Sequence, residues 1–167
     1  LDRKLISAEI TKIKDLFQEK KIDEDKLKDL LNIKFNKGFN QIRDASLLGD
    51  KTKVNSLINE IEFLNEDTFF YLNQMNSRIS KLIEVKNLDE SFRNEEEAID
   101  NIKPKIFWKD KPIFINQLKK WKKNQLEFIL NKVGKTELLL KKNSQIRNDV
   151  VIKSLLINIC NQASNSF

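Results

Sequence analysis

Residues 65–86 have the sequence NEDTFFYLNQMNSRISKLIEVK, and this stretch decides the fold class. Its apolar side chains recur at intervals of three and four residues, which is the spacing that places side chains on one face of an α-helix. The polar run 65–67 interrupts the preceding pattern, so we expect a long helix that starts there and reaches about Lys86. The side chains expected to face inward are Phe69, Leu72, Met75, Ile79, Leu82 and Ile83.

The same helical period continues on both sides of this stretch, and β-branched residues nowhere alternate with a period of two. The sequence therefore predicts an all-α protein, with a two-helix segment followed by a bundle of five or six helices. Helices are expected at about 2–20, 23–31, 37–48, 50–64, 111–121, 124–142 and 147–161, with a weaker one within 87–104.

Punctuating residues support these boundaries. Gly49 is expected to end the helix at 37–48 in a left-handed conformation, and Asp50 to cap the next helix. Pro112 is suited to the first turn of the helix at 111–121. A polar connector at 32–37 divides the chain into expected domains 1–33 and 34–167.

The C-terminal helices carry the longest apolar patterns. The helix at 147–161 is apolar on more than one face, which predicts a place at the bundle centre or against a partner. Residues 163–167 are expected to fray. In the helix at 124–142 the expected inward residues are Leu126, Ile129, Leu130, Val133, Leu138 and Leu139.

Composition excludes several classes of protein. The chain is 40% hydrophobic and 34% charged, with 3 glycines and 2 prolines among 167 residues. That balance is not typical of disordered, collagenous or turn-rich all-β chains. No apolar run approaches the roughly 20 residues that span a bilayer, and no apolar core of a secretion signal follows the first residues. A single cysteine, Cys160, cannot form an internal disulfide, so we expect a cytoplasmic protein without a membrane partner.

The chemistry of common active sites is missing from the sequence. There is no histidine, and the three glycines stand alone, so no phosphate-binding loop is present. Zinc sites and Ser–His or Cys–His nucleophiles are excluded on the same ground. Acidic runs such as Glu95–Glu97 are interpreted as helix starts rather than Mg²⁺ ligands. We therefore expect no catalytic, cofactor-binding or metal residues, and no enzymatic activity of this chain.

One segment, 103–123, concentrates positive charge. Its net charge is +7, whereas the whole chain carries +6. An A+T-rich coding sequence favours lysine, but such a bias should spread lysines evenly along the chain. The candidate contact residues for DNA or a partner subunit are Lys103, Lys105, Phe107, Trp108, Lys109, Lys111, Lys119, Lys120, Lys122 and Lys123.

Four aromatic residues lie among these lysines. Cationic side chains beside stacking side chains are what nucleic-acid binding requires. For Phe114 and Trp121, seven residues apart on one predicted helix, the preferred interpretation is burial in the core. For Phe107 and Trp108, in the preceding loop, burial and exposure remain equally open.

The segment 102–112 contains Pro104, then an apolar–aromatic triplet at 106–108 and a basic stretch, and ends at Pro112. It resembles the corresponding motif of the delta subunit family of the bacterial DNA polymerase III clamp loader. Trp121, which ends the following helix, and Glu137–Lys141 in the next helix continue the likeness. Upstream, 44–50 and 72–82 resemble the preceding helices of that family, and 10–13 and 22–27 resemble the helical lid of an AAA+ module.

The resemblance covers most of the chain in the order of the family. It departs at Asn65, where a glycine is often seen, and at Lys122, where a Ser or Thr commonly caps a helix. It implies that 1–33 is the remnant of an AAA+-type lid domain and that 34–167 is a helical collar domain. The chain would then be the C-terminal half of a longer protein.

The resemblance also implies partners. A collar domain assembles with the other clamp-loader subunits as a hetero-oligomer that supports loading of the sliding clamp onto DNA during replication. The delta subunit contacts the sliding clamp through an N-terminal domain that is not in this sequence. It has no working nucleotide site, and DNA contact is expected to be weak or confined to the assembled complex. The alternative is a free-standing, basic, helical nucleic-acid-binding module.

Overall fold

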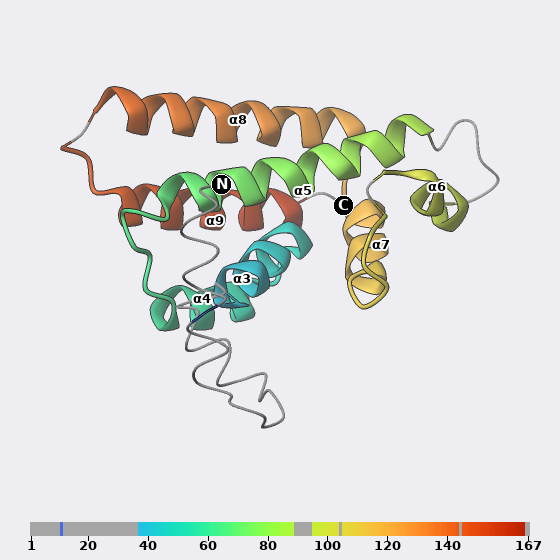
Figure 1. The fold of residues 1–167 in the computed structure, drawn as a ribbon, viewed down its shortest axis with the longest axis horizontal. Helices are drawn as coiled ribbons and strands as arrows, with labels where there is room; N and C mark the ends of the chain where they lie inside the picture. The colour runs from blue at the N-terminus through green and yellow to red at the C-terminus, as the bar shows by residue number, and fades with distance from the viewer. Residues whose placement is uncertain (1–10, 12–36, 89–94, 104, 144, 166–167) are drawn as a thin grey trace. The chain divides into compact units, whose positions relative to one another are not determined.

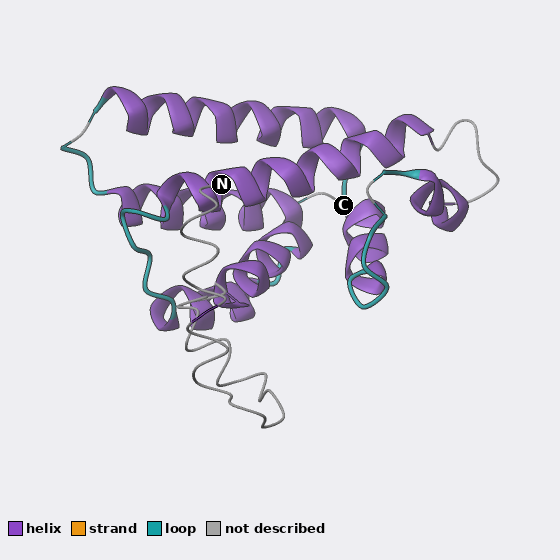
Figure 2. Cartoon of the chain, viewed as in Figure 1, coloured by secondary structure: helices purple, strands orange, loops and turns teal. Residues whose placement is uncertain are grey.

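The computed structural model describes residues 11, 37–88, 95–103, 105–143 and 145–165. The chain divides into two units, Leu1–Lys37 and Gly38–Phe167. Within the described ranges every regular element is a helix, as predicted (Figures 1 and 2). The helices are α3 (Lys37–Leu48), α4 (Lys51–Glu60), α5 (Thr68–Leu88), α6 (Glu95–Asn101), α7 (Lys111–Lys120), α8 (Lys123–Lys142) and α9 (Asn148–Ser164). The helices predicted at 2–20 and 23–31, and with them the lid assignment, lie outside the described residues apart from Thr11, which is helical.

The junction of α3 and α4 forms as predicted. Gly49 has a φ of 74°, in the left-handed region that glycine adopts without steric cost. The side chain of Asp50 accepts a hydrogen bond of 2.9 Å from the backbone N–H of Lys53, which caps α4. The helix then ends at Glu60, four residues before the predicted end, because Ile61 is already extended.

Helix α5 is the central element, and it packs against α6, α7, α8 and α9 (Figure 1). In its inward stripe, Ile83 is partly buried and packs against the core, as predicted. The stripe differs from the prediction at Phe69, which is 43% exposed, whereas Tyr71 is buried. The reason is local packing: the Tyr71 ring stacks on Phe39 of α3 with 4.6 Å between ring centroids. This contact turns the face centred on Tyr71, not on Phe69, toward the core.

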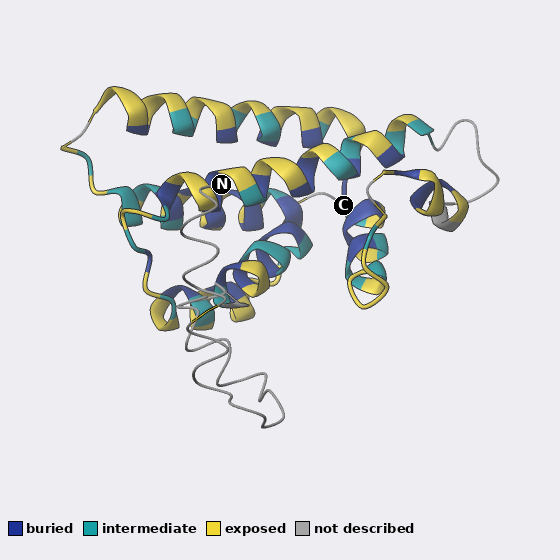
Figure 3. Cartoon of the chain, in the orientation of Figure 1, coloured by how far each residue is buried: buried dark blue, intermediate teal, exposed yellow. Residues whose placement is uncertain are grey.

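Helix α8 lies alongside α5 and exposes its far side, as Figure 3 shows. Leu126, Ile129 and Val133 are buried as predicted. The prediction that Leu138 and Leu139 face inward is wrong, because both are exposed and Leu140 is buried in their place. Within three consecutive leucines only one can continue the spacing of three and four from Val133, and Leu140 is that residue, seven positions on.

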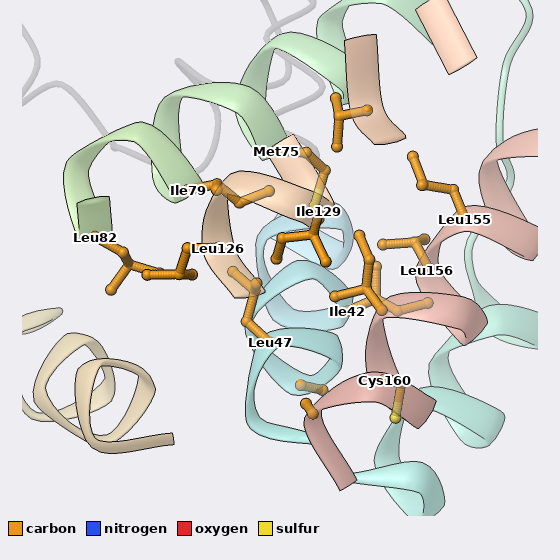
Figure 4. Packing of buried hydrophobic residues seen from close by; sticks show 14 of the residues in the cluster. Ile42, Leu47, Met75, Ile79, Leu82, Leu126, Ile129, Leu155, Leu156 and Cys160 are labelled. Atoms are coloured by element: carbon orange, nitrogen blue, oxygen red, sulfur yellow. The ribbon is translucent and has the colours of Figure 1, made fainter. Parts of the chain in front are cut away.

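Helix α9 contacts α4, α5 and α8, and Figure 4 shows its side chains meeting those of α3, α5 and α8 in one core. It extends to Ser164, so the predicted fraying is wrong for Ala163, which is fully buried. The end is held because the Ser164 hydroxyl donates a 3.0 Å hydrogen bond to the Gly49 carbonyl. Val150 and Ile157 remain exposed on the opposite side of the helix. None of the described helices is both long enough and apolar enough to cross a bilayer.

Candidate nucleic-acid interface

The turn between α6 and α7 carries the first half of the basic segment. The backbone N–H of Asp110 donates to the Phe107 carbonyl at 2.9 Å, which closes a tight turn over 107–110. Helix α7 begins directly after Asp110, with Pro112 in its first turn as predicted. A short turn fixed to a helix start leaves little room for the two aromatic side chains to fold inward.

Phe107 and Trp108 are accordingly exposed, by 56% and 69%. Their ring centroids lie 5.8 Å apart with the planes tilted by 49°. The Lys109 ammonium sits 5.3 Å from the centroid of the Trp108 ring, within the range of a cation–π contact. Of the two alternatives that the sequence leaves open, the structure therefore shows exposure: both rings are available to a partner.

The charges around this aromatic pair are mostly positive. Lys103, Lys105 and Lys109 are exposed. Lys111 is partly buried and pairs with Asp100 of α6 at 2.7 Å, so it contributes less to an external field. The resulting surface joins two stacking rings to three solvent-facing ammonium groups, the combination that binds single-stranded nucleic acid.

The remaining candidate lysines belong to a different place. Lys119 and Lys120 end α7, and Lys122 and Lys123 begin α8. Helix α7 has 10 residues, and a helix rises about 1.5 Å per residue. Roughly 15 Å of helix therefore separates these lysines from the turn at 107–110, which we call the aromatic turn. The structure thus divides the basic segment into two clusters, one at each end of α7.

The inner face of α7 anchors both clusters to the core. Phe114 is fully buried and Trp121 is 3% exposed, which confirms the prediction that they are core residues. The Trp121 indole N–H donates a 2.7 Å hydrogen bond to the Leu47 carbonyl of α3. That bond satisfies the one polar group of the indole, so the whole side chain can be buried without an unpaired donor.

A buried polar group that sequence reasoning missed also fixes α7. Gln117 is fully buried, and its side-chain oxygen Oε1 accepts a 2.8 Å hydrogen bond from Arg78 Nε of α5. Its amide donates to Asp44 Oδ1 of α3 at 3.2 Å, and Arg78 Nε lies 3.7 Å from the same oxygen. Gln117 lies between Phe114 and Trp121 on the inner face of α7, so a polar residue at that register position was the available signal.

Arg78 is the charged member of this Asp44–Arg78–Gln117 network. Burial lowers the pKa of its guanidinium to about 10, while the negative charges of Asp44 and Asp110 oppose that shift. The group therefore stays protonated at neutral pH. Its carbon Cζ lies 4.7 Å from the centroid of the Phe114 ring, a second contact between α5 and α7. One of its nitrogens, Nη2, is buried without a hydrogen-bond partner.

Among the described residues, no three Asp, Glu or Cys side chains gather as a metal site would require.

Comparison with protein-family models, with curated proteins and with solved structures finds no match to this chain. The functional assignment therefore rests on the motifs of the sequence and the geometry of the folded chain.

Proposed function

We propose that 34–167 is the collar domain of a delta-type subunit of the bacterial DNA polymerase III clamp loader. In this role it assembles with the other loader subunits and supports loading of the sliding clamp onto DNA. The domain is a scaffold without a catalytic site of its own, and the clamp itself would be contacted only through an N-terminal domain.

One observation carries the proposal. The segments 44–50 and 72–82 and the residue Trp121, which carry part of the family resemblance, are far apart in the sequence but meet in the core. Arg78 of the segment 72–82 lies 3.7 Å from Asp44 of the segment 44–50, and the buried Gln117, which is not part of the resemblance, bonds both side chains. The Trp121 indole donates a hydrogen bond to the Leu47 carbonyl. Contacts among separate matched segments are expected when those segments share one fold.

Exposed apolar side chains support a role in assembly. Val150 of α9, Leu138 of α8 and Phe70 of α5 are each about half exposed. Covering such side chains with a partner removes apolar surface from water, which favours association. A collar domain would cover some of them with neighbouring subunits.

The experiment is co-expression of the tagged chain with the other clamp-loader subunits of the same genome, followed by affinity capture. The collar proposal predicts that those subunits co-purify in a fixed ratio. A Phe107→Ala/Trp108→Ala double variant removes the exposed aromatic pair without touching the core, and loss of co-purification in that variant alone would place the aromatic pair at a subunit contact. Capture of the chain alone, while the other subunits assemble without it, would contradict the proposal.

The second candidate function is nucleic-acid binding by the chain alone, and the exposed Phe107–Trp108 pair favours it. Fluorescence anisotropy with single-stranded and duplex DNA at two salt concentrations separates the two. As a collar domain the chain should bind only weakly, with a dissociation constant of about 10⁻⁴–10⁻⁶ M at physiological salt, because a few lysines provide only non-specific affinity. Nanomolar binding that survives high salt would favour the dedicated nucleic-acid module.

A further inference from the structure

An open groove lies where α8 begins and α9 ends, at the opposite end of α7 from the aromatic turn. Its volume is about 470 Å³. The residues that line it are Trp121, Asn124, Gln125, Phe128, Gln162 and Asn165. Neither the proposed collar assembly nor the aromatic turn requires this groove.

The lining has an unusual chemistry. Four of its side chains are carboxamides, a group with both a donor and an acceptor, and none is charged. The Gln125 oxygen already accepts a 3.0 Å hydrogen bond from the Lys122 backbone N–H at the start of α8. Beside them Phe128 is 60% exposed, so one aromatic ring is presented to whatever enters. A ligand that matches both features is planar and uncharged and has donors and acceptors on its edge. Nucleobases have this chemistry, because they stack on aromatic rings and form hydrogen bonds along their edges.

The charged residues near the groove indicate which of these ligands fits best. Lys122 and Lys123 come directly before Asn124 in the sequence, and both are exposed, as is Lys119 at the end of α7. None of these lysines lines the groove, but Lys122 and Lys123 stand in the sequence between two residues that do, Trp121 and Asn124, so their charges favour a phosphate backbone outside it. A free base or an uncharged peptide would use the groove alone, whereas a single-stranded polynucleotide would use both parts.

We propose that this groove holds one unstacked base of a single-stranded nucleic acid, with the base against Phe128 and the adjoining phosphates toward Lys122 and Lys123. The site goes beyond collar assembly, and it is separate from the Phe107–Trp108 turn. The two clusters of the basic segment would then be two contacts on one strand, on either side of α7.

The chain has two tryptophans, and one of them, Trp121, lines the groove. A Trp108→Phe variant therefore leaves a single tryptophan, whose emission on selective tryptophan excitation reports on this site. Titration with a single-stranded oligodeoxynucleotide of about 12 nucleotides, a length within the usual site sizes, should change the Trp121 emission. Adding Phe128→Ala should weaken binding roughly 5- to 150-fold, the range expected when one stacking partner is lost. Phe128→Tyr should retain binding.

Phe70→Ala is the matched control, because Phe70 is also exposed but lies on α5, outside the groove. It should leave the affinity unchanged. Binding detected by anisotropy without any change in Trp121 emission, or unaffected by Phe128→Ala, would overturn the site while leaving the aromatic turn and the collar in place. An uncharged peptide that changes Trp121 emission as strongly as the oligonucleotide would also overturn it. Co-purification with the loader subunits is a separate measurement. Its failure would contradict the collar proposal and would leave the proposed base site unaffected.

Discussion

Gly49 and Gly134 show how differently one residue type is used in this chain. At Gly49, φ is 74°, and a Cβ atom would lie 2.9 Å from the backbone nitrogen of Ser164. At Gly134, within α8, a Cβ atom would meet nothing within 4 Å. The fold therefore requires a glycine at the first position and only tolerates one at the second.

This contrast gives a paired prediction. Gly134→Ala should stabilise the protein by about 0.5–1 kcal/mol, because alanine favours a helix interior over glycine by that amount. Gly49→Ala should destabilise it by more than about 1 kcal/mol, since the left-handed backbone and the contact with α9 both disfavour a side chain. Urea denaturation of the two variants measures both free energies of unfolding. Equal effects of the same sign would contradict the placement of the two glycines.

Gln117 provides a second prediction for a single residue. Gln117→Leu should lower the free energy of unfolding by about 2–3 kcal/mol, because Arg78 then loses its buried acceptor while its charge stays inside the protein. Asn116→Leu, on the exposed side of the same helix, is the matched control and should change stability by less than about 0.5 kcal/mol. A small effect of Gln117→Leu in urea denaturation would mean that the Asp44–Arg78–Gln117 network does not hold α7 in place.

Cys160 predicts a difference in chemical reactivity. Burial raises the pKa of its thiol, so at pH 8 a smaller fraction is thiolate in the folded protein than in the unfolded chain. Because the thiolate is the reactive form, a disulfide reagent should modify the native protein much more slowly than the protein in urea. As the pH rises towards the raised pKa of the folded protein, the difference between the two modification rates should become smaller. Equal rates in the two states at pH 8 would show that this side chain is not buried between α9 and the helices packed against it.

At the scale of elements, periodicity predicted the helices of 37–167 well, but predicted their rotation less well. The starts and ends of α3, α7 and α8 follow from Gly49, Pro112 and the spacing of apolar residues. The predicted rotation of a helix about its own axis is wrong where apolar residues are adjacent, as at Phe69 and at Leu138–Leu140. Periodicity defines a broad stripe, and the choice among neighbours within it depends on contacts such as that between Tyr71 and Phe39, which join distant parts of the sequence.

The candidate site could likewise be predicted only in part. The cluster of lysines and aromatics was visible in the sequence, and so was the inward placement of Phe114 and Trp121. The exposure of Phe107 and Trp108 depends on the turn that Asp110 closes, and the split into two clusters depends on the length of α7. The bond from Arg78 to Gln117 spans 39 residues, and no local pattern indicates such a pair.

Helix α9 provides a testable prediction at the scale of elements. Leu155→Asp should destabilise the bundle by more than about 3 kcal/mol, because Leu155 is 3% exposed and its replacement would bury an unpaired charge. Val150→Asp, in the first turn of the same helix, should leave the fold intact, since Val150 is half exposed and a negative charge is favourable near a helix start. Thermal unfolding followed by circular dichroism compares the stabilities of the two variants. A Leu155→Asp variant that unfolds like the original protein would show that α9 is peripheral.

At the scale of the whole molecule, the collar proposal assigns the exposed apolar side chains to contacts with other subunits. Phe70, Leu138 and Val150 belong to three different helices, so no change within one helix would cover all of them. The buried network of Asp44, Arg78 and Gln117 keeps α3, α5 and α7 in a fixed arrangement, which suits a domain that must present constant faces to its neighbours. The central claim is therefore about assembly rather than about chemistry.

The most direct test is the mass of the particle that contains this chain. The purified chain is mixed with the separately purified clamp-loader subunits of the same genome, and the mixture is analysed by size-exclusion chromatography with light scattering. The collar account predicts that the chain leaves its own elution position and appears in one larger particle with a defined number of copies. A chain that elutes at 19.7 kDa beside a complete loader that excludes it would contradict the account.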